Sequence, residues 1–356
     1  MKTILSALTC LSIFSATAFS EAPVSFDQKG DIKALSENIK AEVKASGASG
    51  PKAEAASEGP GFCLFDVRTG APLAGAAAFK AAVGAGDVVF AGETHDQMQD
   101  HMAQLEALKA LGAARGEKVV VGFEMLNLTL QPVLDEYAAG KLTDEEFLLK
   151  AGWQTEWGFD FNFYKPLFDY IRANKLKALA LNLPKKVVSK IARVGLNGLS
   201  PSEKQYLPAR VEITKNEAYI KYIRQTYEGH GKAPEKSHAG LLRRHILGKT
   251  RKAGMGDFTF ENYLAAMSAW NETMGARLAD FLNANPGFAG LSVAGAGHVI
   301  YNAGIPASVA SRTSGLKPVS LYPQDAAACP AAFPAEDAGL ADYVWYLDHS
   351  VPAGAK

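Results

Sequence analysis

Short apolar segments alternate with longer amphipathic segments from residue 87 onward, and this alternation constrains the fold more than any other feature. The four clearest strand candidates are Asp87–Ala91, Lys118–Met125, Leu176–Leu181 and Gly290–Ala294. Weaker candidates follow at 319–322 and 343–346. Strands that alternate with helices are joined by right-handed crossovers, which place them parallel to one another. The sequence therefore predicts an α/β fold whose mostly parallel sheet is flanked by helices.

Two helix starts are marked by capping signals. Thr143 is followed by Asp144, Glu145 and Glu146, which is typical of a capping box. Asp96 stands three residues before Gln99, so the same signal predicts a helix that begins just after the first strand.

The segment between the third and fourth strands, about 185–286, is too long for a single crossover. Its pattern is helical throughout, and it ends in a long candidate helix over Phe260–Asn283. We expect a helical insertion that forms a smaller second lobe.

The first 20 residues have the pattern of a secretory signal peptide. Lys2 precedes an apolar stretch over residues 4–14, and small residues follow it. A lipoprotein signal with Cys10 as the lipidated residue is disfavoured, because Thr9 is bulky and the apolar run continues past the cysteine. We expect export to the periplasm, a flexible segment over residues 21–61 that is rich in small and charged residues, and a folded domain over residues 62–350.

The composition gives no support for nucleic-acid binding and leaves open whether a disulfide forms. The chain has 37 basic and 37 acidic residues, so no overall field attracts nucleic acid. Removal of the signal peptide leaves two cysteines, Cys63 and Cys329. In an oxidising compartment these two could form a disulfide, and two buried thiols are the alternative.

Polar side chains stand where the predicted strands end. Glu93 and His95 follow the first strand, Glu124 closes the second, Asn182 ends the third and His298 follows the fourth. Carboxyl ends of parallel strands share one edge of a sheet, where open α/β folds bind ligands. A single residue at a strand end is more often a helix cap or a surface group, but several together predict a shared pocket.

Two chemistries suit these residues. Two imidazoles and two carboxylates, from Glu93, His95, Glu124 and His298, form a ligand set for a divalent metal ion such as Zn, Mn, Co or Fe. The same groups also serve general acid–base catalysis without a metal. The chain contains neither His-Glu-x-x-His nor Cys-x-x-Cys-His, which excludes an ordinary zincin and a c-type haem protein.

Aromatic residues are concentrated in two places. Residues 153–170 contain eight aromatic side chains in eighteen, and the helical segment adds Tyr219, Tyr222 and Tyr263. Tyrosine is a known ligand of haem iron, and a row of aromatic rings suits a flat macrocycle. Tyrosines at helical spacing are also common in ordinary cores, so the pattern alone leaves both interpretations open.

A set of motifs resembles the ChaN-like haem-binding uptake proteins, within the wider Tiki, TraB and erythromycin-esterase-like group. The main four motifs are Gly92–His95, Gly122–Met125, Ala269–Met274 and Gly295–Val299, and shorter matches lie at Tyr164–Leu167, Ala180–Asn182, Gly304–Pro306 and Ala341–Tyr346. The resemblance covers about residues 62–347 and rests on the order and spacing of the motifs. It implies a parallel α/β sheet with a smaller helical lobe.

The resemblance also implies a function. It implies an exported protein that binds haem for iron uptake, that forms a homodimer around its haem and that serves an outer-membrane haem uptake system. Family members hold the haem iron through a tyrosine, for which Tyr219, Tyr222 and Tyr263 are the candidates here. The alternative is a Tiki-type metal-dependent protease, which would use the two Gly-x-x-His motifs that end at His95 and His298 together with Glu93 and Glu124.

Overall fold

A computed structural model describes residues 63–230 and 259–350. Its centre is an eight-stranded sheet with the order β2-β1-β8-β7-β3-β6-β4-β5. The strands are β1 (Leu64–Asp66), β2 (Ala71–Pro72), β3 (Val88–Glu93), β4 (Val119–Asn127), β5 (Lys177–Asn182), β6 (Ala289–Gly295), β7 (Pro318–Asp325) and β8 (Tyr343–Leu347). Neighbouring strands from β8 to β5 are parallel, whereas β1 runs antiparallel to β8 and to β2.

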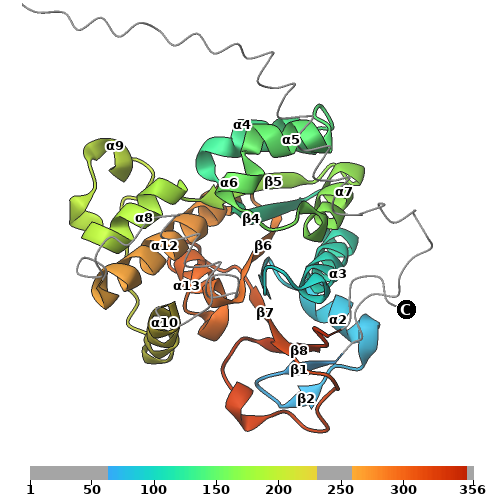
Figure 1. The fold of residues 1–356 in the computed structure, drawn as a ribbon. Coiled ribbons are helices and arrows are strands. Elements are labelled where there is room, and N and C mark those ends of the chain that lie inside the picture. Colours follow the sequence, from blue (N-terminus) through green and yellow to red (C-terminus); the bar gives the residue numbers. More distant parts are fainter. Residues whose placement is uncertain (1–62, 231–258, 351–356) are drawn as a thin grey trace, which may run out of the picture. The chain divides into compact units, whose positions relative to one another are not determined.

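Helices connect these strands and cover both faces of the sheet (Figure 1). The α-helices are α2 (Gly75–Gly84), α3 (Met98–Arg115), α4 (Gln131–Ala138), α5 (Asp144–Ala151), α6 (Trp153–Glu156), α7 (Lys165–Ala173), α8 (Lys185–Val194), α9 (Pro201–Lys204), α10 (Glu217–His230), α12 (Phe260–Ala284) and α13 (Ile305–Ala310). Short 3-10 turns lie at Leu128–Leu130, Phe161–Phe163, Leu196–Gly198, Ala296–His298, Ile300–Asn302 and Ala335–Asp337.

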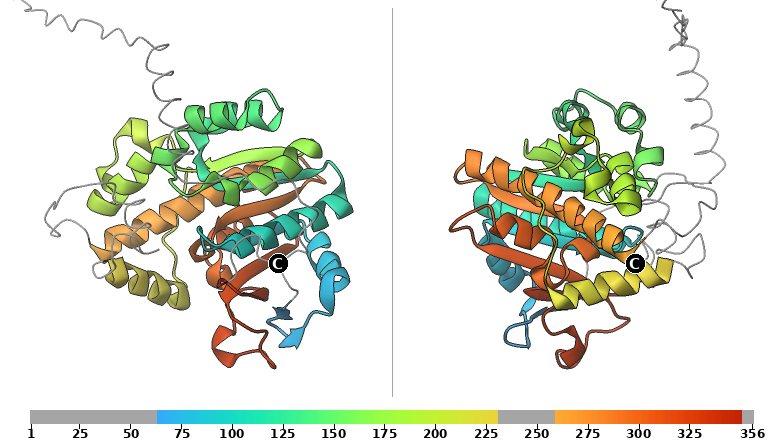
Figure 2. Two further views of the ribbon diagram at one scale, coloured as in Figure 1. Left: turned by 45° about the vertical axis from the view of Figure 1, so that its right-hand side comes forward. Right: turned by 90° about the vertical axis from the view of Figure 1, so that its left-hand side faces the viewer.

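Alternation along the strands builds two cores. In β3, Val89 and Ala91 pack into one core together with α3 and α7. Val88 and Phe90 pack into the other, together with α8, α10, α12 and α13. Successive side chains of a strand point to opposite faces, so a strand that is apolar throughout must be covered on both sides. The two helical layers are visible in the turned views (Figure 2).

The predicted α/β class is confirmed, and each strand candidate overlaps an observed strand. The described part of the segment between β5 and β6 contains α8, α9, α10 and α12, as expected, and residues 205–216 between α9 and α10 form no helix. Its last helix, α12, packs against β5, β6 and α8, so this helix belongs to the layer over the sheet. The antiparallel strands β1 and β2 were not expected, because two or three residues carry too little periodic pattern to be recognised.

One capping signal is confirmed and the other is wrong. Thr143 accepts a hydrogen bond from the backbone N–H of Glu146, and the Glu146 side chain accepts one from the N–H of Thr143. Helix α3 instead begins at Met98 after Gln97, without a side-chain cap. Asp100 in its first turn accepts a hydrogen bond from Thr94, so the acidic group that orders this turn is a different one.

Two of the three cysteines are joined. Cys63 and Cys329 form a disulfide with 5.6 Å between their Cα atoms, and 266 positions separate them along the chain. The bridge ties the residue before β1 to the loop between β7 and β8. The expected signal peptide, Cys10 and the segment 21–61 lie outside the described residues. Within residues 63–230 and 259–350, no helix combines the length and the apolar content that a membrane span needs.

Candidate functional site

Five predicted residues lie at the carboxyl edge of the sheet. Glu93 ends β3 and His95 follows it, Glu124 lies near the end of β4, Asn182 ends β5, and His298 lies in the 3-10 turn after β6. Each of the five side chains is at most 5% exposed. Because β3, β6, β4 and β5 are parallel neighbours, their carboxyl ends must lie side by side.

Glu93 is the centre of the first polar cluster. Its Oε1 lies 2.8 Å from His95 Nδ1 and accepts a hydrogen bond of 2.8 Å from the hydroxyl of Tyr164. Its Oε2 accepts a hydrogen bond of 2.8 Å from Gln104 Nε2 and lies 3.4 Å from His101 Nδ1. Three of these partners come from α3 and the start of α7. They satisfy a carboxylate that would otherwise be very costly to bury.

These contacts set the charge of the first cluster. Burial raises the pKa of Glu93, but the nearby His101 charge and the hydrogen bonds from His95 and Gln104 outweigh it, so the pKa is lowered. Burial lowers the pKa of His95, but the hydrogen bond to Glu93 and the negative charge of Glu124 leave it raised. The pair therefore favours a carboxylate beside an imidazolium.

Glu124 is the centre of the second cluster. Its Oε2 accepts a hydrogen bond of 2.6 Å from the backbone N–H of Gly295, and its Oε1 lies 3.3 Å from His298 Nε2. The other ring nitrogen of His298 lies 2.7 Å from Asn271 Oδ1 on α12. Burial raises the pKa of Glu124, but His298, His95 and the Gly295 N–H together lower it to about 2.

Gly295 separates the two clusters. A Cβ atom at this position would lie 2.7 Å from His95 Cε1 and 3.5 Å from Glu124 Oε2. No side chain fits there, so glycine allows the His95 ring to approach the backbone of β6 closely. The first glycine of the Gly-Ala-Gly-His motif is thus explained by packing.

The two glutamates point to opposite faces of the sheet. Glu93 has the same strand parity as Val89 and Ala91, which pack beneath α3 and α7. Glu124 has the same parity as Val120, which packs beneath α12. Each glutamate therefore pairs with its own histidine on its own side of the sheet.

This arrangement does not support the predicted divalent-metal site. Two carboxylate–imidazole pairs are present, Glu93 with His95 and Glu124 with His298. In each pair, the oxygen and nitrogen atoms that would bind a metal ion contact each other instead. Over the described part of the chain, no group of three or more His, Cys, Asp or Glu side chains is arranged to hold a metal ion. The metal-dependent protease alternative depends on such a group, so the structure does not favour it.

Asn182 lies at this edge but acts on the backbone. Its Nδ2 donates to the carbonyl of Glu124 at 2.6 Å, and its Oδ1 accepts from the N–H of Leu183 at 2.7 Å. It joins the ends of β4 and β5, where the strand register shifts. Asn182 lies at the sheet edge where the sequence placed it. Its side chain bonds the backbone and holds the ends of the two strands together.

Sequence reasoning missed three partners of the two clusters: Tyr164, Gln104 and Asn271. Tyr164 belongs to the aromatic segment noted above, and Asn271 belongs to one of the four motifs. Nothing in the local pattern distinguishes them from ordinary helix residues. Only the packing of α3, α7 and α12 against the strand ends brings them to the glutamates.

The three candidate tyrosines differ in accessibility. Tyr219 is fully buried, donates to the Gly297 carbonyl at 2.9 Å and accepts from Asn271 at 2.8 Å. Tyr263 is 1% exposed. Tyr222 is only partly buried, and its hydroxyl lies close to Gly297, where an added Cβ would be 3.1 Å away. Among the three, Tyr222 is the least buried.

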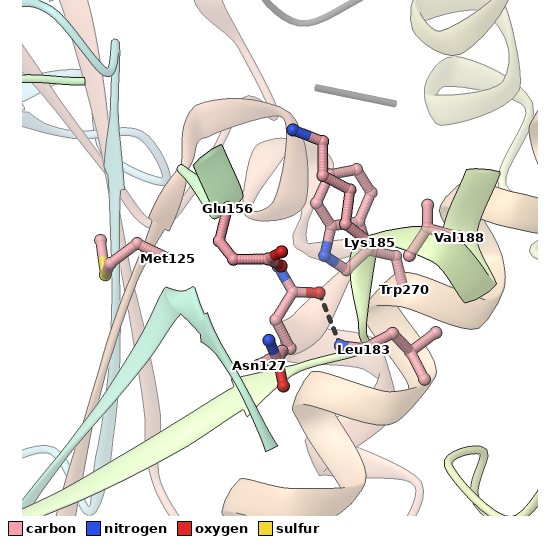
Figure 3. A pocket seen from close by; sticks show the side chains of 8 residues that line it. Met125, Asn127, Glu156, Leu183, Lys185, Val188 and Trp270 are labelled. Atoms are coloured by element: carbon pink, nitrogen blue, oxygen red, sulfur yellow. Dashed lines mark hydrogen bonds between the residues drawn. The ribbon is translucent and has the colours of Figure 1, made fainter. Parts of the chain in front are cut away.

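A small pocket opens beside the second cluster (Figure 3). Its empty volume, open mouth included, is about 320 Å³. Its walls come from the ends of β4 and β5, from α6, from the first turn of α8 and from α12. Trp270 of α12 forms part of the wall and packs edge-on against His298, with 4.9 Å between the ring centres. None of the three candidate tyrosines lines this pocket.

A family model described as haem-binding uptake, Tiki superfamily, ChaN, matches residues 80–309. The chain belongs to this ChaN family. The match spans well over half of the chain and includes both clusters, the pocket and α10. It agrees with the resemblance that the four motifs carry.

A solved structure shows the same fold as this ChaN-family chain. A structure of ChaN of Campylobacter jejuni with cofacial haem is 18% identical, covers 79% of this chain and 94% of its own, and superposes with a TM-score of 0.55. An erythromycin esterase mutant in its open conformation is 13% identical, covers 69% and 72% of the two chains, and has a TM-score of 0.38. Among curated proteins, none matches the sequence.

Proposed function

We propose that this protein binds haem in haem-iron uptake. The observation that carries the proposal is the family match over residues 80–309, which includes β3, β4, β5, β6 and α10. The haem named with the solved ChaN structure of Campylobacter jejuni supports the same class of ligand. Haem, when bound, supplies an iron centre that takes a phenolate oxygen as a ligand.

Helix α10 carries tyrosine hydroxyl groups that could bind haem iron. Tyr222 is partly exposed and lies beside Tyr219, with 6.3 Å between their ring centres, and near Tyr301 and Tyr322. Tyr219 is held by Asn271 and the Gly297 carbonyl, so it anchors α10 to the strand ends and leaves the outer position to Tyr222. We therefore assign Tyr222 as the residue that would bind the iron.

A haemin titration tests this assignment. The full mature chain should give a saturable Soret shift, and Tyr222→Phe should weaken binding by at least about tenfold, the effect expected when a direct ligand is removed. Tyr227→Phe, on the same helix, is the matched control and should leave the Soret spectrum unchanged. Wild-type protein without a saturable shift would overturn the proposal, and equal binding by Tyr222→Phe would overturn the assignment alone.

We further propose that the protein is exported to the periplasm, dimerises around haem and delivers it within an outer-membrane haem uptake system. The pattern of residues 1–20 supports export, and membership of an uptake family supports the rest. Cell fractionation of the full chain and of a variant lacking residues 2–20 tests export. Light scattering with and without haemin tests dimerisation, because haem between two subunits should double the mass only when haem is present.

A further inference from the structure

His349, which follows β8, contacts two other elements of the fold. Its Nε2 lies 2.8 Å from Oδ1 of Asp100, in the first turn of α3. Its Nδ1 lies 3.8 Å from Oδ1 of Asp325, the last residue of β7, and its backbone N–H donates to the same oxygen at 3.2 Å. The side chain is 14% exposed, so it is largely packed but still open to water. His349 therefore joins the end of β8 to α3 and β7.

Asp100 extends this contact to the first polar cluster. Its side chain is fully buried, and its two oxygens have different partners. Oδ1 contacts His349, whereas Oδ2 accepts a hydrogen bond of 2.7 Å from the backbone N–H of Thr94. Thr94 stands between Glu93 and His95, which form the pair of that cluster. One buried carboxylate thus connects the end of β8 to the turn that carries the Glu93–His95 pair.

A second histidine supports the same turn but is closed to solvent. His101 Nε2 lies 3.2 Å from the backbone carbonyl oxygen of His95. The His101 side chain is 1% exposed, and its neighbours are the buried rings of the cluster. Of the two histidines that support the turn, His349 is the one that can exchange a proton with water while the fold stays closed.

The charged groups that face His349 are carboxylates on several elements. They are Asp100 on α3, Asp325 on β7, Asp96 in the turn before α3, and Asp348 beside His349 in the chain. The hydrogen bond to Asp100 and the negative charges together outweigh burial, so the pKa of His349 is raised. Loss of the proton removes the positive charge between these carboxylates, and their mutual repulsion then opposes the closed arrangement.

We propose that His349 is a pH-responsive latch: while protonated, it holds Asp100 and, through Asp100, the Thr94–His95 turn, and loss of the proton loosens this turn. A histidine whose pKa is raised by folding stabilises the fold fully below its unfolded value of about 6.5. That stabilisation is lost as pH rises through the raised folded value. The latch is therefore closed in mildly acidic solution and loosened in alkaline solution. This inference does not depend on haem binding.

Hydrogen exchange of the full chain, followed by mass spectrometry, tests the proposal. A peptide that covers residues 91–97 reports the Thr94 N–H, and one that covers residues 119–123 of β4 is the internal reference. Labelling times are corrected for the intrinsic effect of pH on exchange. Protection of the first peptide should fall by at least about threefold between pH 6 and pH 9, as expected when a charge-assisted hydrogen bond is weakened. The reference peptide, from a buried strand, should change by less than about twofold.

Two variants separate the latch from a general effect of pH. His349→Gln keeps a hydrogen-bond donor near Asp100 but cannot take up a proton, so its first peptide should show no such fall. Asp325→Asn removes a carboxylate beside the ring and should move the midpoint of the wild-type change to lower pH. The Asp325 side chain is 67% exposed, so this variant should fold even if His349→Gln does not, and thermal unfolding checks both. An equal fall in wild type and His349→Gln, or a midpoint that Asp325→Asn leaves in place, would refute the latch.

Discussion

Glu124 of β4 and His298, which follows β6, form a buried pair with 3.3 Å between Oε1 and Nε2. Neither residue is near the other in the chain, and the pair exists because β4 and β6 are parallel neighbours. The Gly295 N–H and Asn271 complete the surroundings of the two side chains. This pair and the Glu93–His95 pair connect the sheet to α12 and α3, so we expect both pairs to contribute to the stability of the fold.

Acid should destabilise the protein through Glu124. The pKa of this carboxyl is lowered from 4.5 to about 2 in the folded state, so the stabilisation is present above pH 4.5 and is lost as pH falls toward 2. The difference corresponds to at most about 3 kcal/mol. Urea unfolding between pH 2 and pH 6 measures it. Glu124→Gln should be less stable at pH 6 and should show a shallower fall; an equal slope in both proteins would contradict the lowered pKa.

Gly295→Ala should disturb the first cluster. The added Cβ would lie 2.7 Å from His95 Cε1, so the imidazole or the strand must move, at a cost of about 1–3 kcal/mol. Gly290→Ala is the matched control on the same strand, since its Cβ would meet methyl groups of Leu278, Leu282 and Val88, at 3.2, 3.3 and 3.5 Å. Chemical denaturation of both variants compares them. Equal losses would show that the close approach of His95 does not matter.

Removal of the Tyr164 hydroxyl should be costly for its size. The hydroxyl donates to Glu93 at 2.8 Å and accepts from Trp157 Nε1 at 3.0 Å. Tyr164→Phe leaves buried polar partners without these bonds, and we expect a loss of about 1–3 kcal/mol. Tyr170→Phe, on α7 and only partly buried, serves as the comparison. A loss in Tyr164→Phe no greater than in that control would be evidence against a structural role for the cluster.

Reduction of the disulfide should lower the thermal midpoint. The bridge joins positions 266 residues apart, and loss of a native disulfide typically costs about 2–5 kcal/mol. The double variant with Cys63→Ser and Cys329→Ser should unfold at the same lower temperature with or without reductant. Unfolded, unreduced mature protein should contain no free thiol. Two free thiols in that assay would show that the bridge does not form.

The order of strands and helices was predictable because hydrophobic periodicity is a local property. The apolar run over 118–125 indicated a strand, and β4 covers it and is buried on both faces. Residues at the ends of such strands could be assigned to one edge, since parallel strands share it. The helix after β3 was predicted, but its capping residue was wrong: α3 begins at Met98 without a side-chain cap, and Asp100 accepts a hydrogen bond from the Thr94 N–H.

The sequence by itself determined the α/β class, the strand ends and the set of polar residues at one edge of the sheet. Tertiary structure decided how those residues pair. Strand parity sends Glu93 and Glu124 to opposite faces, and the helices above each face supply Tyr164 and Asn271. Tertiary packing also buried Tyr219 and Tyr263 more completely than Tyr222. Periodicity follows from neighbours along the chain, whereas pairing and exposure follow from neighbours in space.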